Sequence, residues 1–263
     1  MSGEAPRDRV RLPLRRILFG AFALSWRHRA ELARATGLPV LAVIACTLLW
    51  NVAGVAQIGS AVWTLHFVYA IAISWLAISV HRLMLLDGEE TRPRFDSVGL
   101  RRLGLFVGTV IGATLVYLAL LLVLMNLSLL PFSRYVSAGE TPSPSQAREW
   151  SPWLFYGACV LAMWPIARLS PMFPAIAVDR GFDPITAWRM TRGNGWKLVV
   201  IIGVLPWTMK WIVAVLQRDG ATRVEFGILL VLTSVFTVIQ VAALSLSYWE
   251  LTQPAPPPTS PPA

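Results

Sequence analysis

Six long apolar runs constrain what this chain can fold into more than any other feature of its sequence. A helix that crosses a bilayer needs about 20 mostly apolar residues, and a lipid-exposed segment must satisfy its backbone hydrogen bonds internally. The runs are residues 38–58, 63–86, 103–127, 153–178, 197–217 and 226–249. They predict an all-α, polytopic membrane protein with six transmembrane helices.

The composition supports a membrane protein and divides the chain into three parts. Of its 263 residues, 56% are hydrophobic and only 14% are charged, whereas roughly a quarter are charged in a soluble domain. We expect a basic leader with an amphipathic helix over 1–37, a six-helix domain over 38–250 and a disordered Pro-rich tail over 251–263. The leader is too long and too basic for a secretory signal, so the first run is expected to stay as an anchor.

The cationic residues lie in the gaps between the runs and predict the topology. Seventeen Lys and Arg fall in the leader and in the second-to-third and fourth-to-fifth connections, against four in the other connections. Cytoplasmic loops collect such residues, so both termini are predicted to be cytoplasmic. A nucleic-acid binder would gather its cations on one folded face, so a nucleic-acid partner is not expected. The arginine bias indicates a GC-rich bacterial genome, and the cytoplasmic (inner) membrane of a bacterium is the expected location.

The segment Asp183–Trp196 predicts a short amphipathic helix in the membrane interface. Asp183 is a good N-cap, Pro184 a good first residue, and Gly193-Asn194-Gly195 a good left-handed stop. Ile185, Ala187 and Trp188 are expected to face lipid, and Thr186, Arg189 and Arg192 to face water and headgroups. The candidate residues for binding anionic lipid headgroups are therefore Trp188, Arg189, Arg192 and Asn194.

The same kind of phrase occurs before two other pairs of runs. Ala21–Leu32 matches Ala187–Leu198 without gaps at an Ala, an aromatic residue, Leu or Met, Ser or Thr, and the final Leu. Phe95–Gly104 again combines an Asp or Ser cap with paired arginines. The pattern predicts three repeats of an interfacial helix followed by a membrane hairpin, with chance similarity as the alternative.

Three stretches carry a resemblance to a group of bacterial membrane proteins. They are "SPMFPAIAVDRGFDPITAWRMTRGNGWKLVVII", "HRLMLLDGEE" after the second run and "LSLSYWEL" at the end of the sixth. The chain resembles the membrane domain attached to some glycerophosphoryl diester phosphodiesterases and the uncharacterised six-helix inner-membrane families related to it. The resemblance implies a six-helix membrane bundle. The phosphodiesterase chemistry of that group belongs to a separate soluble barrel, so no catalysis is implied here.

Two features inside the runs are candidates for helix packing or binding. Gly104, Gly108 and Gly112 lie on one face of the third helix, and small residues four apart let helices approach closely, either within one chain or in a homo-oligomer. Arg168 lies in a run interrupted by three prolines. A charge in the membrane is costly, so Arg168 is expected to bind an anion, to reach the headgroups or to pair with Glu250.

Polar stripes run along the second and sixth helices and are interpreted as hydrogen-bonded packing, with a substrate path as the alternative. The stripes are His66, Ala70, Ser74, Ala77 and His81 in the second helix, and Thr233, Thr237, Gln240 and Ser247 in the sixth. The histidines lack metal-ligand spacing, and Cys46 and Cys159 lie in separate apolar runs. No metal, cofactor or disulfide is expected.

The sequence contains no phosphate-binding loop, nucleophile elbow or membrane-facing carboxylate pair, so an enzyme is not expected. The leading hypothesis is a protein that binds or handles anionic lipids or assembles envelope partners, with a homo-oligomer or an unidentified protein partner left open. The alternative is the permease subunit of an ABC-type transporter, because Gly193 is followed by Leu205-Pro206 at the spacing of its coupling loop. The Glu-Ala-Ala phrase of that loop is replaced by Ala187-Trp188-Arg189.

Overall fold

The computed structural model describes residues 11–55, 59–86, 96–137, 144–181, 183–217 and 223–253, and these form helices joined by short turns, without strands. Six of its helices are long and apolar enough to cross a membrane. The chain is therefore an all-α, multi-pass membrane protein, as the apolar runs predict. The tail predicted over 251–263 begins later, because the last helix continues to Thr252, and residues 254–263 lie outside the described residues. The acidic residues Asp87, Glu89 and Glu90 also lie outside them.

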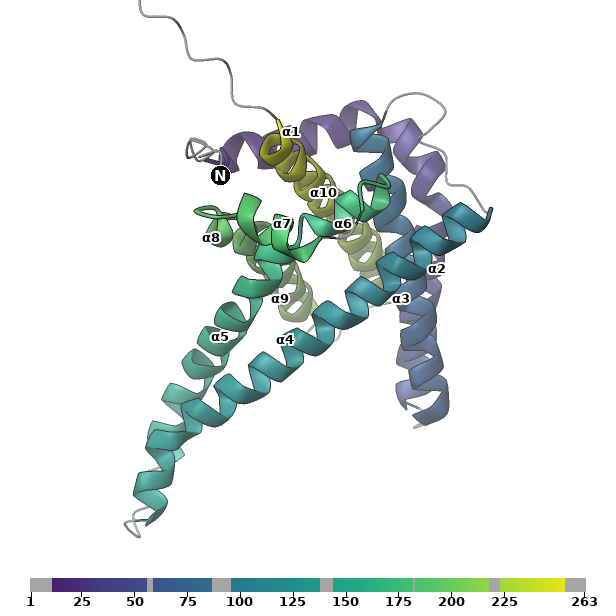
Figure 1. Ribbon diagram of the computed structural model, residues 1–263. Coiled ribbons are helices and arrows are strands. Elements are labelled where there is room, and N and C mark those ends of the chain that lie inside the picture. Colours follow the sequence, from purple (N-terminus) through teal and green to yellow (C-terminus); the bar gives the residue numbers. More distant parts are fainter. Residues whose placement is uncertain are drawn as a thin grey trace, which may run out of the picture.

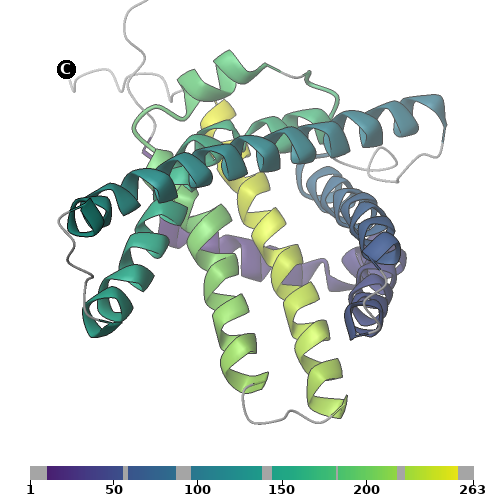
Figure 2. The ribbon, with the colours of Figure 1, turned by 90° about the horizontal axis from the view of Figure 1, so that it is seen from below.

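The spanning helices form three antiparallel hairpins (Figures 1 and 2). The first hairpin pairs α2 (Arg29–Val55) with α3 (Gly59–Leu85), and the second pairs α4 (Ser97–Ser137) with α5 (Pro144–Leu169). The third pairs α9 (Leu205–Gln217) with α10 (Arg223–Thr252). The α3 and α10 helices pack against each other, and thus connect the first hairpin to the third.

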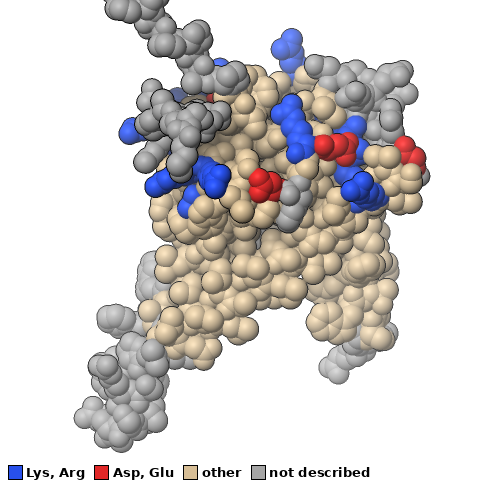
Figure 3. Space-filling model, in the orientation of Figure 1, with Lys and Arg blue, Asp and Glu red and all other residues tan. Residues whose placement is uncertain are grey.

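Four short helices gather at the end of the bundle where α10 also ends (Figure 1). They are α1 (Leu14–Arg27), α6 (Met172–Ala177), α7 (Pro184–Met190) and α8 (Gly195–Val199). We call this end the short-helix end. On the face seen in Figure 3, the charged side chains lie at this end, above an apolar belt. Such a division is what a bilayer imposes on a spanning protein.

The α1 helix is amphipathic and lies across α10 (Figure 1). Its buried residues Ile17, Ala21 and Ser25 are four apart and therefore share one face. Arg15 and Arg16 are exposed on the other side. The predicted amphipathic helix of the leader is present, but the first spanning helix begins at Arg29, directly after it, rather than at residue 38.

A separate interfacial helix precedes the first and third hairpins but not the second. Asp96 caps α4, because its Oδ1 accepts a hydrogen bond from the Gly99 amide at 2.8 Å. From Ser97 onward this segment is the first part of α4 itself. The prediction of a separate interfacial helix over 95–104 is therefore wrong. At about 1.5 Å per residue, the 41 residues of α4 exceed the roughly 30 Å of a hydrocarbon core. This helix runs obliquely past α5 (Figure 1).

A π-helical segment, Val200–Val204, joins α8 to α9 and makes one continuous span of 195–213. Pro206 has no amide hydrogen, and its ring would clash with the carbonyl of Ile202 in a regular helix. A π-helical turn relieves that clash by widening the helix. Leu205-Pro206, which the permease alternative places in a cytoplasmic loop, thus lies inside a candidate membrane span.

Candidate functional site

The α7 helix begins and ends as its sequence predicts. The Asp183 carboxylate accepts a hydrogen bond from the Ile185 amide at 3.0 Å, and Pro184 is the first helical residue. Hydrogen bonds from Thr186 lower the pKa of Asp183 below its ordinary value, which keeps the cap ionised. Beyond the helix, Gly193 has a φ of +86° and reverses the chain at no steric cost. Asn194 does not take a left-handed conformation, and Gly195 already begins α8.

The two faces of α7 differ as expected, with one exception. Arg189 and Arg192 are exposed, and neither forms an ion pair with a described acidic residue. Ile185 and Trp188 are also exposed, on the apolar side of the helix. Ala187 was expected to face lipid but is buried, since α7 packs against α5.

Arg168, in the last turn of α5, connects that helix to α7. Its guanidinium carbon lies 3.8 Å from the centre of the Trp188 ring and 5.2 Å from that of Trp164. A guanidinium nitrogen also donates a hydrogen bond to the Trp188 carbonyl. Cation–π contacts and a backbone acceptor thus compensate the charge. The expected pairing with Glu250 is not present.

Thr191 and Gly195 complete the junction between α5 and α8. The Thr191 hydroxyl is 3.1 Å from the Arg168 carbonyl and 2.8 Å from that of Ala187. A Cβ at Gly195 would lie 2.8 Å from the indole nitrogen of Trp164, closer than real Cβ atoms approach other heavy atoms. Only glycine therefore lets the start of α8 approach α5 this closely.

Asn194 and Lys197 hold the beginning of the described chain. The Leu12 amide donates to the Asn194 side-chain oxygen at 3.0 Å, and the Lys197 ammonium donates to the Leu12 carbonyl at 2.7 Å. Asn194 is 2% exposed and Leu12 is 1% exposed. The side chain that was expected to bind headgroups is thus buried against the chain's own backbone.

Two buried arginines and one aspartate form a cluster that joins α3, α4 and the turn after α6. Arg102 Nε donates to the Asp179 carboxylate at 2.9 Å, and Arg82 donates to the Ala177 carbonyl at 3.0 Å and to Asp179 at 3.4 Å. Arg82 is 5% exposed and Arg102 is 6% exposed, while the Asp179 side chain is 51% exposed. We call these three residues the Arg–Asp cluster.

Asp179 adopts a conformation that suits this contact. Its φ of +59° is in the left-handed region, which Asp tolerates better than most residues. Partial burial raises the pKa of the carboxyl, but the hydrogen bonds and charges of Arg102 and Arg82 outweigh burial and hold the pKa below 3.8. The carboxylate therefore stays ionised at neutral pH.

Sequence reasoning missed the Arg–Asp cluster because it counted Arg82 and Arg102 only as loop cations. The available signal was their position at the ends of two apolar runs, with Asp179 directly after the fourth run. Such arginines must find a partner once the helix ends are buried.

The glycine face of α4 lines a groove and does not pack closely against another helix. A Cβ added at Gly104, Gly108 or Gly112 would meet nothing within 4 Å. The groove has a volume of about 450 Å³, and its other wall includes Ile166, Met172, Phe173 and Pro184. The expectation that these glycines pack closely within one chain is therefore wrong, and contact with a second copy stays a prediction.

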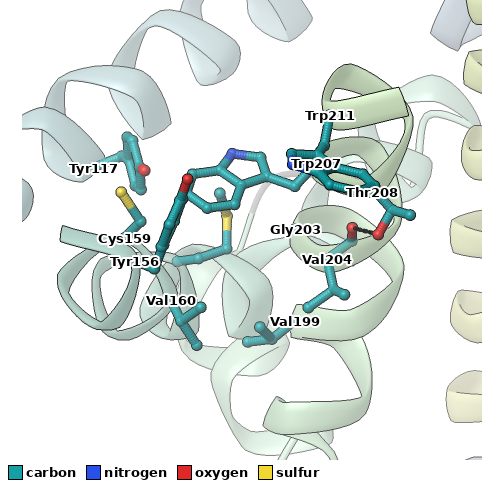
Figure 4. Close-up of a pocket in the computed structure, with 11 residues that line it drawn as sticks. Tyr117, Tyr156, Cys159, Val160, Val199, Gly203, Val204, Trp207, Thr208 and Trp211 are labelled. Atoms are coloured by element: carbon teal, nitrogen blue, oxygen red, sulfur yellow. Dashed lines mark hydrogen bonds between the residues drawn. The ribbon is translucent and has the colours of Figure 1, made fainter. Parts of the chain in front are cut away.

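A second apolar pocket of about 430 Å³ lies between α5 and the π-helical segment (Figure 4). Tyr156 and Trp207 meet edge to face at its mouth, with ring centres 5.5 Å apart. Gly203 permits the close packing behind it, since a Cβ there would lie 2.9 Å from Met163 Cγ. Such a lining suits an apolar ligand such as an acyl chain.

One hydrogen bond of the polar stripes joins two helices, and the described bonds of Thr233, Thr237 and Ser247 stay within α10. His81 Nδ1 lies 2.7 Å from the Ser245 hydroxyl and joins α3 to α10. His66 Nδ1 lies 2.8 Å from the Val62 carbonyl, and its ring contacts that of Trp50 at a tilt of 57°, with ring centres 3.7 Å apart. Cys46 and Cys159 are both buried free thiols. Within the described ranges, no group of three or more His, Cys, Asp or Glu side chains is arranged to hold a metal ion.

Comparison with known proteins found no similar protein. No family model, curated protein or solved structure matches the chain. Its function is therefore argued from the geometry alone, and the resemblance to phosphodiesterase-linked membrane domains stays an expectation.

Proposed function

We propose that this protein is an integral protein of a bacterial cytoplasmic membrane that binds anionic lipid headgroups and catalyses no reaction itself. The observation that carries the proposal is the presentation of Arg189 and Arg192 on α7. Both are exposed next to the apolar Ile185 and Trp188, and neither forms a salt bridge with a described acidic residue, although the charge of Arg189 helps to lower the pKa of Asp183. A rigid helix with this division lies naturally at the boundary between headgroups and acyl chains.

The anchoring of α7 supports this role. Arg168 stacks on Trp188 and donates to its carbonyl, so α7 is fixed to α5 while its own arginines point outward. Each Lys or Arg near an anionic leaflet contributes about 1 kcal/mol to membrane binding. Two arginines on a fixed helix lose little conformational freedom in the backbone when a headgroup binds, which favours a defined contact.

Removal of the two charges on α7 tests the proposal. We expect Arg189→Gln/Arg192→Gln to reduce the anionic lipid that co-purifies in mild detergent, by roughly thirtyfold at low salt if each charge contributes about 1 kcal/mol. Insertion into the membrane should not change. The difference should shrink at high salt because exposed charges are screened. Quantitative mass spectrometry of bound lipids measures the effect.

A matched control removes the same charge from another interfacial helix. Arg15→Gln/Arg16→Gln changes two exposed arginines of α1. An equal loss of lipid in both double variants would show that net charge, and not the α7 surface, retains the lipid. Loss of a co-purifying ATPase without loss of lipid would instead favour a protein-docking role, as in the permease alternative.

The proposed orientation places the short-helix end in the cytoplasm, together with both termini. Reporter fusions after Gly88, Ser143 and Gly220 are expected to report inside, outside and outside, respectively, because cations favour the cytoplasmic side. An inside signal at Ser143 would overturn this topology. Activity of paired cytoplasmic and periplasmic reporters at each position provides the measurement.

A further inference from the structure

An apolar groove lies between α1 and α2 on one side and α10 on the other, and no residue of α7 lines it. Its volume is about 460 Å³, within the range of roughly 300–1,000 Å³ typical of ligand sites. The walls that face each other are made by Leu32, Thr36, Gly37 and Val40 from α2 and by Val231, Val235, Val238 and Ile239 from α10. The groove therefore lies within the first and last membrane spans, with the α1–α2 junction at one end.

A cation lines the groove at that junction. Arg29, the first residue of α2, is exposed, and its guanidinium carbon lies 5.3 Å from the centre of the Trp26 ring. Arg29 also donates to the Trp26 carbonyl at 3.3 Å. Arginine and tryptophan together at the end of an apolar groove are the groups that meet a phosphate and the interfacial region of a bilayer.

Ser25 supplies an independent sign of a ligand. Its side chain lines the groove and is 9% exposed, and its buried hydroxyl has no hydrogen-bond partner among the described residues. Serines in helices commonly donate to the carbonyl four residues earlier, as Ser234 on the opposite wall does to Leu230 at 2.9 Å. A buried polar atom without a partner is uncommon, and the other described case, Ser74 in α3, does not line this groove.

The segment Ala187–Leu198, which matches Ala21–Leu32 in sequence, shows which groups surround the residue that corresponds to Ser25. Ser25 corresponds to Thr191, and both are buried, as are the matched pairs Ala21 and Ala187. The Thr191 hydroxyl is bonded to backbone carbonyls of α5 and α7, including that of Arg168. In the first unit no such carbonyl from the neighbouring helix reaches Ser25, and the groove is open there.

We propose that this groove holds one acyl chain of an anionic glycerophospholipid. In this arrangement Arg29 binds the headgroup phosphate, the Ser25 hydroxyl donates to the ester carbonyl, and the chain lies along the valines of α10. The inference deepens the proposed function and rests on it in one respect, because it requires the short-helix end to lie at headgroup level.

The hydrogen bond is tested with two serines of the same groove. The protein is reconstituted with an equal mixture of phosphatidylglycerol and phosphatidylcholine, extracted in mild detergent, and the retained lipid is counted by native mass spectrometry. Ser25→Ala should lower retained phosphatidylglycerol about fivefold, as the loss of one hydrogen bond gives. Its unfolding midpoint after delipidation should not fall, since Ser25 has no protein partner to lose. Ser234→Ala, whose hydroxyl is already bonded, should retain lipid as the wild type does.

The acyl site is tested by filling the groove. A Cβ at Gly37 would meet nothing within 4 Å, so Gly37→Phe places its ring in the groove without a backbone clash and should remove the lipid that the groove retains. Gly104→Phe, which has the same open surroundings in the groove beside α4, is the control and should retain it. Phosphatidylglycerol with a photoreactive acyl chain should label residues 231–239, and Gly37→Phe should abolish that labelling.

Arg29→Gln should reduce the preference for phosphatidylglycerol over phosphatidylcholine while photolabelling of 231–239 continues. Unchanged lipid retention in both Ser25→Ala and Gly37→Phe, or labelling spread evenly over the helices, would overturn the groove as a lipid site. The α7 experiment is independent of this result. Lipid loss in Arg189→Gln/Arg192→Gln with no change in Gly37→Phe would refute the groove alone, and the reverse would refute the role of α7.

Discussion

Asp179→Asn is expected to destabilise the protein by about 2 kcal/mol, because it leaves two buried arginines without their counter-charge. Removal of one partner from a fully buried ion pair costs about 3–5 kcal/mol. The exposed half of the Asp179 carboxylate reduces that figure, since solvent already screens part of the interaction. Arg82 would retain its bond to the Ala177 carbonyl, but neither guanidinium would face a carboxylate. The midpoint of thermal unfolding in mild detergent provides the measurement.

Asparagine is the appropriate replacement because it isolates charge from backbone conformation. The φ of +59° at residue 179 would disfavour alanine, whereas Asn adopts this region about as readily as Asp. The double variant Asp179→Asn/Arg102→Gln should recover part of the lost stability, since it also removes a buried charge. Wild-type stability in Asp179→Asn would show that the Arg–Asp cluster does not contribute to folding.

The same carboxylate predicts a dependence of stability on pH. Its pKa in the folded protein is below 3.8, so folding favours the ionised form. Its contribution is therefore complete above the ordinary carboxyl pKa and is lost as the pH falls through the lower, folded value. Below pH 3.8 the wild type should lose stability relative to Asp179→Asn, and the two unfolding midpoints should converge.

Gly195→Leu is expected to destabilise the protein and Gly108→Leu is not, although both place the same side chain in a membrane-spanning helix. At Gly195 the first added carbon would lie 2.8 Å from Trp164 and 3.2 Å from Arg168 Cγ. Overpacking of this kind costs about 1–3 kcal/mol, and the value here should be near the top of that range because an indole ring must move. At Gly108 the added carbon meets nothing, so no loss of stability is expected.

Thermal unfolding of the two variants, with size-exclusion chromatography, separates the alternatives for the glycine face. A destabilised Gly195→Leu protein with a normal Gly108→Leu protein supports the described packing. If Gly108→Leu instead changes the oligomeric state, a second copy packs against α4. Separation of Trp188 from Arg168 in Gly195→Leu should also alter tryptophan fluorescence, because Arg168 contacts both Trp164 and Trp188.

The elements themselves were determined by local sequence. Hydropathy located all six spans, because about 20 apolar residues in succession have no stable alternative to a spanning helix. Asp183, Pro184 and Gly193 fixed the beginning of α7 and the turn after it through their own backbone preferences. Such signals act within a few residues and so remain visible in a single chain. The interfacial helix predicted over 95–104 failed because caps and paired arginines also occur at the start of a spanning helix.

The contacts between elements were decided only by the tertiary structure. In a soluble helix the buried face is read from its apolar stripe, but in a membrane both the lipid-facing and the protein-facing sides are apolar. The sequence therefore could not show that Gly195 packs tightly while Gly108 lines a groove. Nor could it show that Arg102 meets Asp179, 77 residues away, or that Asn194 binds the backbone of Leu12, 182 residues away. These partners are selected by the order of helices around the bundle, because a buried charge or amide must be satisfied by whichever group the packing brings within reach.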